Sequence, residues 1–226
     1  MADTGKRSTY HHGQLRRALL DVALDLATTR GIHNFTLREL ARQAGVSHAA
    51  PYHHFADKQA LISALAMEIF QTFTAALKRA WEETDGPPNE RFSAVGAAYV
   101  RFALANPAVF RLMFRADLYE TARDSTSAAG DAGVADHTDT SVMEAGQEAF
   151  EVLLGSVREC QEVGLIAAGD PLIPALAAWS MVHGLATLLL DGVLGPQGTA
   201  ASQDNETLIT SVLSTLRDGI FERPTA

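Results

Sequence analysis

The sequence predicts an all-α protein, on three observations. Apolar residues recur at spacings of three and four over most of the 226 residues, without sustained period-two alternation. Glycine and proline stand between these stretches, where helices have to end. Near the N-terminus, one segment has the pattern of two short helices joined by a tight turn. We therefore expect a series of helices that begins with a helix-turn-helix.

The first predicted helix ends at Gly31, and its apolar stripe consists of Leu15, Leu19, Val22, Ala23, Leu26 and Ala27. The helix-turn-helix follows. Thr36 is placed to cap its first helix, and Gly45 stands at the turn, where glycine adopts a positive φ without steric cost. Ser47 is placed to cap a second helix over His48–His54. In such a unit the second helix commonly enters the major groove of DNA.

The helical pattern continues to the C-terminal region. We expect helices over residues 58–81, 89–106, 108–115, 141–162 and 172–190, and a last one that contains Leu208 to Ile220. Residues 125–140 and 195–205 carry few large apolar side chains, so we interpret them as mobile loops. We place a domain boundary between an N-terminal domain, 1–60, and a helical body, 61–226.

Charge is unevenly distributed along the chain. The net charge is −9, but residues 1–60 carry eight Lys and Arg against five Asp and Glu, near +3. Residues 61–226 carry ten against twenty-two, near −12. A basic head favours phosphate contacts, and an acidic body keeps the remaining surface away from DNA. Lys6, Arg7, Arg16 and Arg17 form either a basic arm near DNA or a solvated N-terminal segment.

Other protein classes are disfavoured. The chain has no run of eighteen apolar residues and no charged, apolar leader, so we expect a cytoplasmic protein rather than a membrane or secreted one. The single Cys160 excludes an intramolecular disulfide, and a redox role for it is a minor alternative. We find no GxSxG, HExxH, P-loop or dinucleotide fingerprint, and therefore expect no enzyme and no cofactor. The clustered histidines lack metal-ligand spacing, so we expect no metal site.

Over roughly Arg16 to Leu65 the chain resembles the TetR (tetracycline-repressor) family of one-component bacterial regulators. Phe-Thr-Leu-Arg-Glu-Leu-Ala, Ala-Gly-Val-Ser and Tyr-His-His-Phe-Ala-Asp-Lys-Gln-Ala-Leu stand in the family's order and spacing. Trp179, His183 and Gly184 resemble the Trp-x-x-x-His-Gly element of one subgroup, and Pro107 to Phe114 resembles its Pro-x-x-Phe-x-x-Met-Phe segment. The resemblance implies a three-helix DNA-binding domain, joined by a long helix to a helical ligand-binding and dimerisation domain.

The resemblance also implies residue roles. Arg38 matches a position that reads guanine in the family, and Tyr52, His54 and Lys58 match residues that grip the DNA backbone. From their chemistry, Thr36 offers a hydroxyl to a phosphate, His48 can donate to a purine edge, and Ala49 and Ala50 can touch a thymine methyl. The alternatives are a solvated surface role for Arg38, a helix-start role for His48 and a packed side chain for His54. One departure is Pro51, which stands where the family commonly has an aliphatic residue.

In the body, the resemblance implies a cavity whose ligand weakens DNA binding. The candidate lining residues are Phe70, Phe73, Tyr99, Phe102, Phe110, Met113, Phe114, Trp179 and His183. Each of them can equally be a core residue. His183 lies in a very apolar helix and therefore needs either an internal hydrogen-bond partner or a ligand group. This lining favours a lipophilic or aromatic effector.

The segment from Leu172 to Leu190 is apolar on nearly all sides. A helix that is hydrophobic all round must be buried all round, and the last two helices of a second copy would cover it. The alternative is a central helix of a monomeric bundle. We expect a homodimer that binds a palindromic operator, by default as a repressor. The competing function is a helical scaffold protein with little specific DNA binding.

Overall fold

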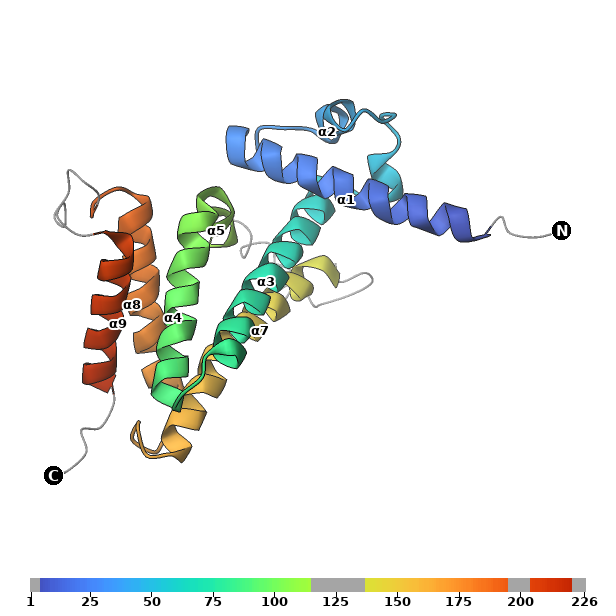
Figure 1. Cartoon of the computed structure of the whole chain (residues 1–226). Coiled ribbons are helices and arrows are strands. Elements are labelled where there is room, and N and C mark those ends of the chain that lie inside the picture. The colour runs from blue at the N-terminus through green and yellow to red at the C-terminus, as the bar shows by residue number, and fades with distance from the viewer. Residues whose placement is uncertain (1–4, 115–136, 195–203, 221–226) are drawn as a thin grey trace, which may run out of the picture. The chain divides into compact units, whose positions relative to one another are not determined.

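The computed structural model describes residues 5–114, 137–194 and 204–220 (Figure 1), and all regular structure within them is helical, as predicted. The elements in chain order are α1 (Gly5–Arg30), α2 (Leu37–Gln43), the 3₁₀ turn η1 (Pro51–His53), α3 (Lys58–Glu83), α4 (Pro88–Ala105), α5 (Pro107–Met113), α7 (His137–Glu162), α8 (Leu172–Leu190) and α9 (Asn205–Ile220).

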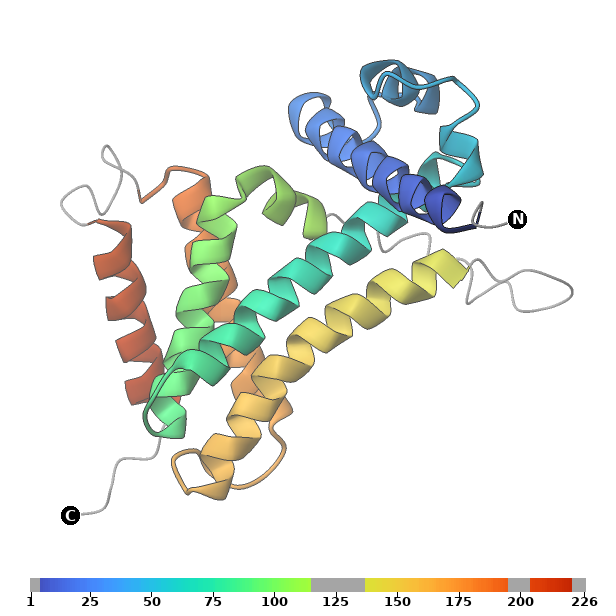
Figure 2. The same cartoon turned by 45° about the vertical axis from the view of Figure 1, so that its right-hand side comes forward.

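The chain divides into two compact units. The first contains α1, α2, η1 and the start of α3 up to Ile69, together with the part from Arg111 to Glu144. The second contains Phe70–Phe110 and the chain from Ala145 onwards. The ribbon of α3 is continuous from one unit into the other (Figure 2). A functional boundary after residue 60 stays a prediction.

The turn after α2 forms as the sequence predicts. Thr36 and Glu39 form a capping box at the start of α2. At the other end, the N–H of Val46 donates to the carbonyl of Ala41 (3.0 Å) and that of Gly45 to the carbonyl of Arg42 (3.2 Å). This is a Schellman arrangement, and it requires the positive φ of +69° that Gly45 adopts.

The prediction of a regular α-helix over His48–His54 is wrong, because most of this segment has the tighter 3₁₀ hydrogen-bond pattern. The N–H groups of Ala50, Tyr52, His53 and His54 each bond the carbonyl three residues earlier, and only the Pro51–His53 part is regular, as a 3₁₀ turn. The reason is Pro51, which lacks the N–H that an α-helix would pair with the Ser47 carbonyl. The Pro51 side chain is buried, and η1 packs against α2. The apolar contact of the motif is thereby kept.

In the second unit α4 packs against both α8 and α9, which also pack against each other. Gly96 on α4 permits this close approach, because a Cβ there would lie 2.6 Å from a methyl carbon of Leu213 and 3.4 Å from one of Val182. Val100, fully buried on the same helix, belongs to this core.

Three predicted boundaries need correction. The first mobile loop was expected to extend to residue 140, but α7 already begins at His137, since 137–140 contain no glycine or proline to stop a helix. Residues 125–136 and 195–203 of the two expected loops lie outside the described residues. Asn205, the expected end of the second loop, begins α9, and Asp204 accepts a hydrogen bond from the Thr207 N–H there. Helix α4 begins at Pro88, one residue earlier than expected.

Two helices, α3 and α8, are long and apolar enough by composition to cross a membrane, although each contains polar residues. In α3, 61% of the apolar window is buried inside the chain, as in the core helix of a soluble protein, whereas in α8 only 28% is buried. The remaining apolar face of α8 includes Ile173, Met181 and Leu188, whose side chains are exposed.

Candidate nucleic-acid interface and effector site

The predicted DNA-contacting residues lie in the first unit, on α2, η1, the turns around them and, for Lys58, the first residue of α3. Most are accessible: Thr36, Arg38, His48, Ala49 and Tyr52 are exposed, and Ala50, His54 and Lys58 are half-buried. Tyr52 is 54% exposed, so its ring and hydroxyl are open to a partner. The helix-turn-helix therefore presents the exposed Arg38 on α2 and polar side chains on and around η1.

Thr36 and Lys58 are both engaged near Glu39. The Thr36 N–H and hydroxyl donate to the Glu39 carboxylate at 2.8 and 3.0 Å, and these bonds hold the pKa of Glu39 below its ordinary value. A phosphate that binds the Thr36 hydroxyl must therefore displace Glu39. The Lys58 ammonium lies 4.5 Å from the centre of the Phe35 ring, and partial burial lowers its pKa while the charge of Glu39 raises it.

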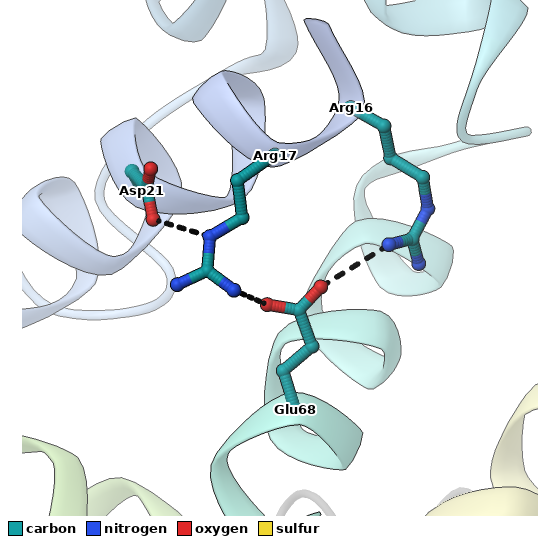
Figure 3. Close-up of polar contacts among 4 residues, drawn as sticks. All are labelled: Arg16, Arg17, Asp21 and Glu68. Carbon is teal, nitrogen blue, oxygen red and sulfur yellow. Dashed lines mark hydrogen bonds and ion pairs between the residues drawn. The ribbon is translucent and has the colours of Figure 1, made fainter. Parts of the chain in front are cut away.

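One ion-paired residue beside the predicted basic arm was not found from the sequence. Glu68, on α3, pairs with both Arg16 and Arg17 of α1, at 3.2 and 2.9 Å (Figure 3). The predicted basic arm is thus partly neutralised within the first unit, and the side chains of Lys6 and Arg7 lie outside those described. Sequence carries no local signal for this pairing, because it joins residues 51 and 52 positions apart.

In the second unit, three predicted effector-site residues form one hydrogen-bonded chain. The Trp179 indole N–H donates to the Tyr99 hydroxyl oxygen at 3.1 Å, and that hydroxyl lies 2.8 Å from Nδ1 of His183. Because the Tyr99 oxygen accepts from Trp179, its own proton can be donated to a neutral His183. The internal partner that His183 needs is therefore present.

Aromatic rings surround these three residues. Phe73 and Phe110 each meet the Tyr99 ring edge-on, at 5.2 and 5.7 Å between centres, and Phe102 lies 5.0 Å from Phe73. Phe150, which sequence reasoning missed, lies 5.7 Å from Trp179. Phe70 is buried and faces Gly146 in the same unit. The other two predicted lining residues, Met113 and Phe114, belong to the first unit.

The environment of His183 gives a testable pH dependence of stability. Burial lowers its pKa below the ordinary 6.5, so as pH falls the unfolded chain takes up the proton first and the free energy of unfolding decreases. We expect the melting temperature of the native protein to fall between about pH 7.5 and 5.5, and to fall less in His183→Gln. The exposed His53→Gln serves as control; an equal fall in native protein and His183→Gln would contradict this assignment.

Cys160 is buried, and burial raises the pKa of its thiol to about 12, with the Glu159 charge as a smaller cause. The thiolate needed for redox chemistry is therefore scarce at neutral pH, which argues against the redox alternative. Among the residues the structure describes, no group of three or more His, Cys, Asp or Glu side chains is arranged to hold a metal ion.

Known proteins share both parts of this architecture. Residues 19–65 match the family described as "Bacterial regulatory proteins, tetR family". Residues 92–216 match the family described as "Tetracyclin repressor-like, C-terminal domain". The HTH-type transcriptional regulator BetI of Klebsiella pneumoniae (strain 342) is 37% identical over 81 residues. That alignment spans 35% of this chain and 42% of BetI, less than half of either protein.

Solved structures match nearly the whole chain. A protein of unknown function from Rhodococcus sp. RHA1 is 38% identical, with a TM-score of 0.74, and the alignment covers 94% of this chain and 98% of that one. The transcriptional regulator FadR from Bacillus subtilis, solved in complex with stearoyl-CoA, has a TM-score of 0.65 at 17% identity, with 90% and 98% covered. At this identity, the likeness to FadR is one of fold.

Proposed function

The chain belongs to the TetR family of bacterial regulatory proteins, and from this membership we propose that it is a ligand-responsive, sequence-specific DNA-binding regulator of transcription. The observation that carries the proposal is the accessible set of Arg38, His48 and Tyr52 on an intact helix-turn-helix. We assign it the role of a cytoplasmic repressor that binds a palindromic operator as a homodimer. BetI, which matches over 81 residues, is a transcriptional regulator with the same kind of motif.

On DNA, Arg38 reads a guanine, because an arginine fork matches two acceptors on the guanine edge in the major groove. His48 donates to a purine edge, and Ala49 and Ala50 contact thymine methyl groups. Tyr52, His54 and Lys58 bind the DNA backbone and set the register, as does Thr36 once its hydroxyl leaves Glu39. The 3₁₀ winding of η1 sets the direction in which Tyr52 projects towards the phosphates.

The effector binds in the second unit, beside the Tyr99, Trp179 and His183 chain. Apolar surface is provided there by the rings of Phe73, Phe102, Phe110 and Phe150. The three hydrogen-bonded side chains supply polar atoms among these rings. Such a lining fits a lipophilic or aromatic molecule with one polar group. The complex of FadR with stearoyl-CoA supports a lipophilic effector for this fold. Phe70, in the same unit, remains a candidate contact.

The dimer forms through α8 and α9. The apolar side chains of Leu172, Ile173, Leu176, Met181 and Leu188 are exposed on α8, whereas Ala175, Ala178, Val182 and Leu185 are buried. An isologous interface covers this face with the same face of a second copy. We call residues 47–54 the recognition segment. The recognition segments of the two copies then lie opposite half-sites that are about one helical turn of DNA apart.

Regulation is a two-state equilibrium of this dimer. The effector binds more tightly to one state and the operator to the other, and α3, which is continuous through both units, connects the two sites. A ligand with equal affinity for both states would change nothing, so the proposal requires that the effector lower operator affinity.

The test is fluorescence anisotropy with the intergenic DNA that flanks the gene of this protein, at two salt concentrations. We expect tight binding that survives an excess of random-sequence competitor at the higher salt, because base contacts add to the phosphate term. Binding that competitor DNA removes completely, or that disappears at moderate salt, would instead support the helical scaffold function.

A further inference from the structure

Four charged side chains meet between α1 and α3 (Figure 3). Nη1 of Arg16 lies 3.2 Å from one oxygen of Glu68, and Nη1 of Arg17 lies 2.9 Å from the other. Nε of Arg17 also donates to Asp21 at 3.0 Å. The formal charges of the two arginines and two carboxylates cancel. Glu68 is the least exposed of the four, with 26% of its side chain accessible, whereas Arg17 is 67% exposed.

This cluster lies beside the recognition segment. The guanidinium carbon of Arg16 is 5.5 Å from the centre of the Phe55 ring. Phe55 follows η1 closely, and its N–H donates to the carbonyl of Pro51, the first residue of that turn. The arginines therefore belong to the same part of the first unit as Tyr52 and His54, which we propose to contact the DNA backbone.

The energetics favour an exchangeable pairing. Ion pairs with exposed partners change an equilibrium constant by at most about fivefold, so these contacts are poor permanent fasteners. Arginine binds phosphate oxygens through the same fork that it offers to a carboxylate, with strong charge-assisted hydrogen bonds. A DNA phosphate close to η1 can thus take the place of the Glu68 carboxylate.

We propose that Arg16 and Arg17 are DNA-backbone contacts that Glu68 holds in the free protein, and that DNA phosphates replace this carboxylate on binding. The inference rests on the proposed DNA-binding function. Glu68 then lowers the affinity for DNA, since its two ion pairs must break before the arginines bind phosphate. The exchange also connects DNA binding to α3, because it releases α1 from Glu68.

The test measures affinity for a random-sequence duplex over a series of KCl concentrations. In Glu68→Gln the affinity at low salt should rise on the order of fivefold, while the slope of log K against log [salt] stays native, since the phosphate contacts are unchanged. In Arg16→Gln/Arg17→Gln the slope should become less steep, by about 0.9 for each phosphate that the variant no longer neutralises. Glu68→Gln in this double variant should then give no further gain.

The control for charge alone is Asp25→Asn, which removes one negative charge from the same unit at a residue whose carboxylate accepts from the Gln43 amide at 2.8 Å. A rise in Asp25→Asn equal to that in Glu68→Gln would overturn the inference, as would a fall in affinity in Glu68→Gln. A native slope in the double arginine variant would by itself overturn the inference. This result decides the question even if Glu68→Gln fails to fold. Native protein that does not bind the duplex at low salt would overturn the proposed function as well.

Discussion

Arg38→Ala is expected to weaken the preference for operator DNA strongly while leaving the fold intact. Arg38 is exposed on α2, so truncation removes no core contact. A bidentate arginine–guanine pair contributes about 1–3 kcal/mol of discrimination, and a symmetric dimer loses two of them. Operator affinity should therefore fall at least about thirtyfold, whereas affinity for random DNA should fall only slightly. Anisotropy titrations with both duplexes measure the ratio of the two affinities.

The matched control is Arg42→Ala, the same change at an exposed residue of the same helix. Loss of a charge near DNA weakens binding to all sequences by a similar factor, so Arg42→Ala should leave the ratio of operator to random affinity near the native value. An unchanged ratio in Arg38→Ala would assign Arg38 to the solvated surface and give base reading to His48 and its neighbours.

Features that depend on neighbouring residues could be predicted from the sequence. Pro171 and Gly192 bracket α8, and Thr36 and Gly45 bracket α2, because caps and positive-φ glycines act within one turn of the chain. The place of the candidate DNA contacts followed from this local pattern. Most of them are exposed, and their contact with DNA stays a prediction.

Features that depend on packing between distant segments could not be predicted. Glu68 meets Arg16 and Arg17 only because the fold brings α1 next to the first part of α3, and a glutamate within a long helix has no sequence feature that marks it. Phe150 joins Trp179 for the same reason. The winding of η1 was a different failure. Pro51 stands out in the sequence, but its effect on the winding depends on the hydrogen bond that it cannot make. Without an N–H for the Ser47 carbonyl, the segment pairs i with i+3 instead.

The largest effect is expected where an interface is disrupted twice by one substitution. Met181 lies on the exposed apolar face of α8, with 37% of its surface accessible in the single chain. Met181→Glu should therefore change the stability of the isolated chain little. In an isologous dimer the substitution places two carboxylates in the interface, and an unpaired buried charge costs on the order of 3–5 kcal/mol. We expect a monomer by sedimentation velocity, and a loss of operator affinity of at least about a hundredfold.

Val163→Glu is the control, since it introduces the same charge at an apolar residue that is 58% exposed but lies outside α8 and α9. It should sediment as the native protein does and bind the operator normally. If Met181→Glu remained a dimer with native operator affinity, the exposed face of α8 would not be the dimer interface. If both variants and the native chain were monomers, a symmetric operator would lose its structural basis, because one helix-turn-helix contacts one half-site. DNA affinity and oligomeric state must therefore be measured together, and only their joint loss in Met181→Glu supports the homodimer.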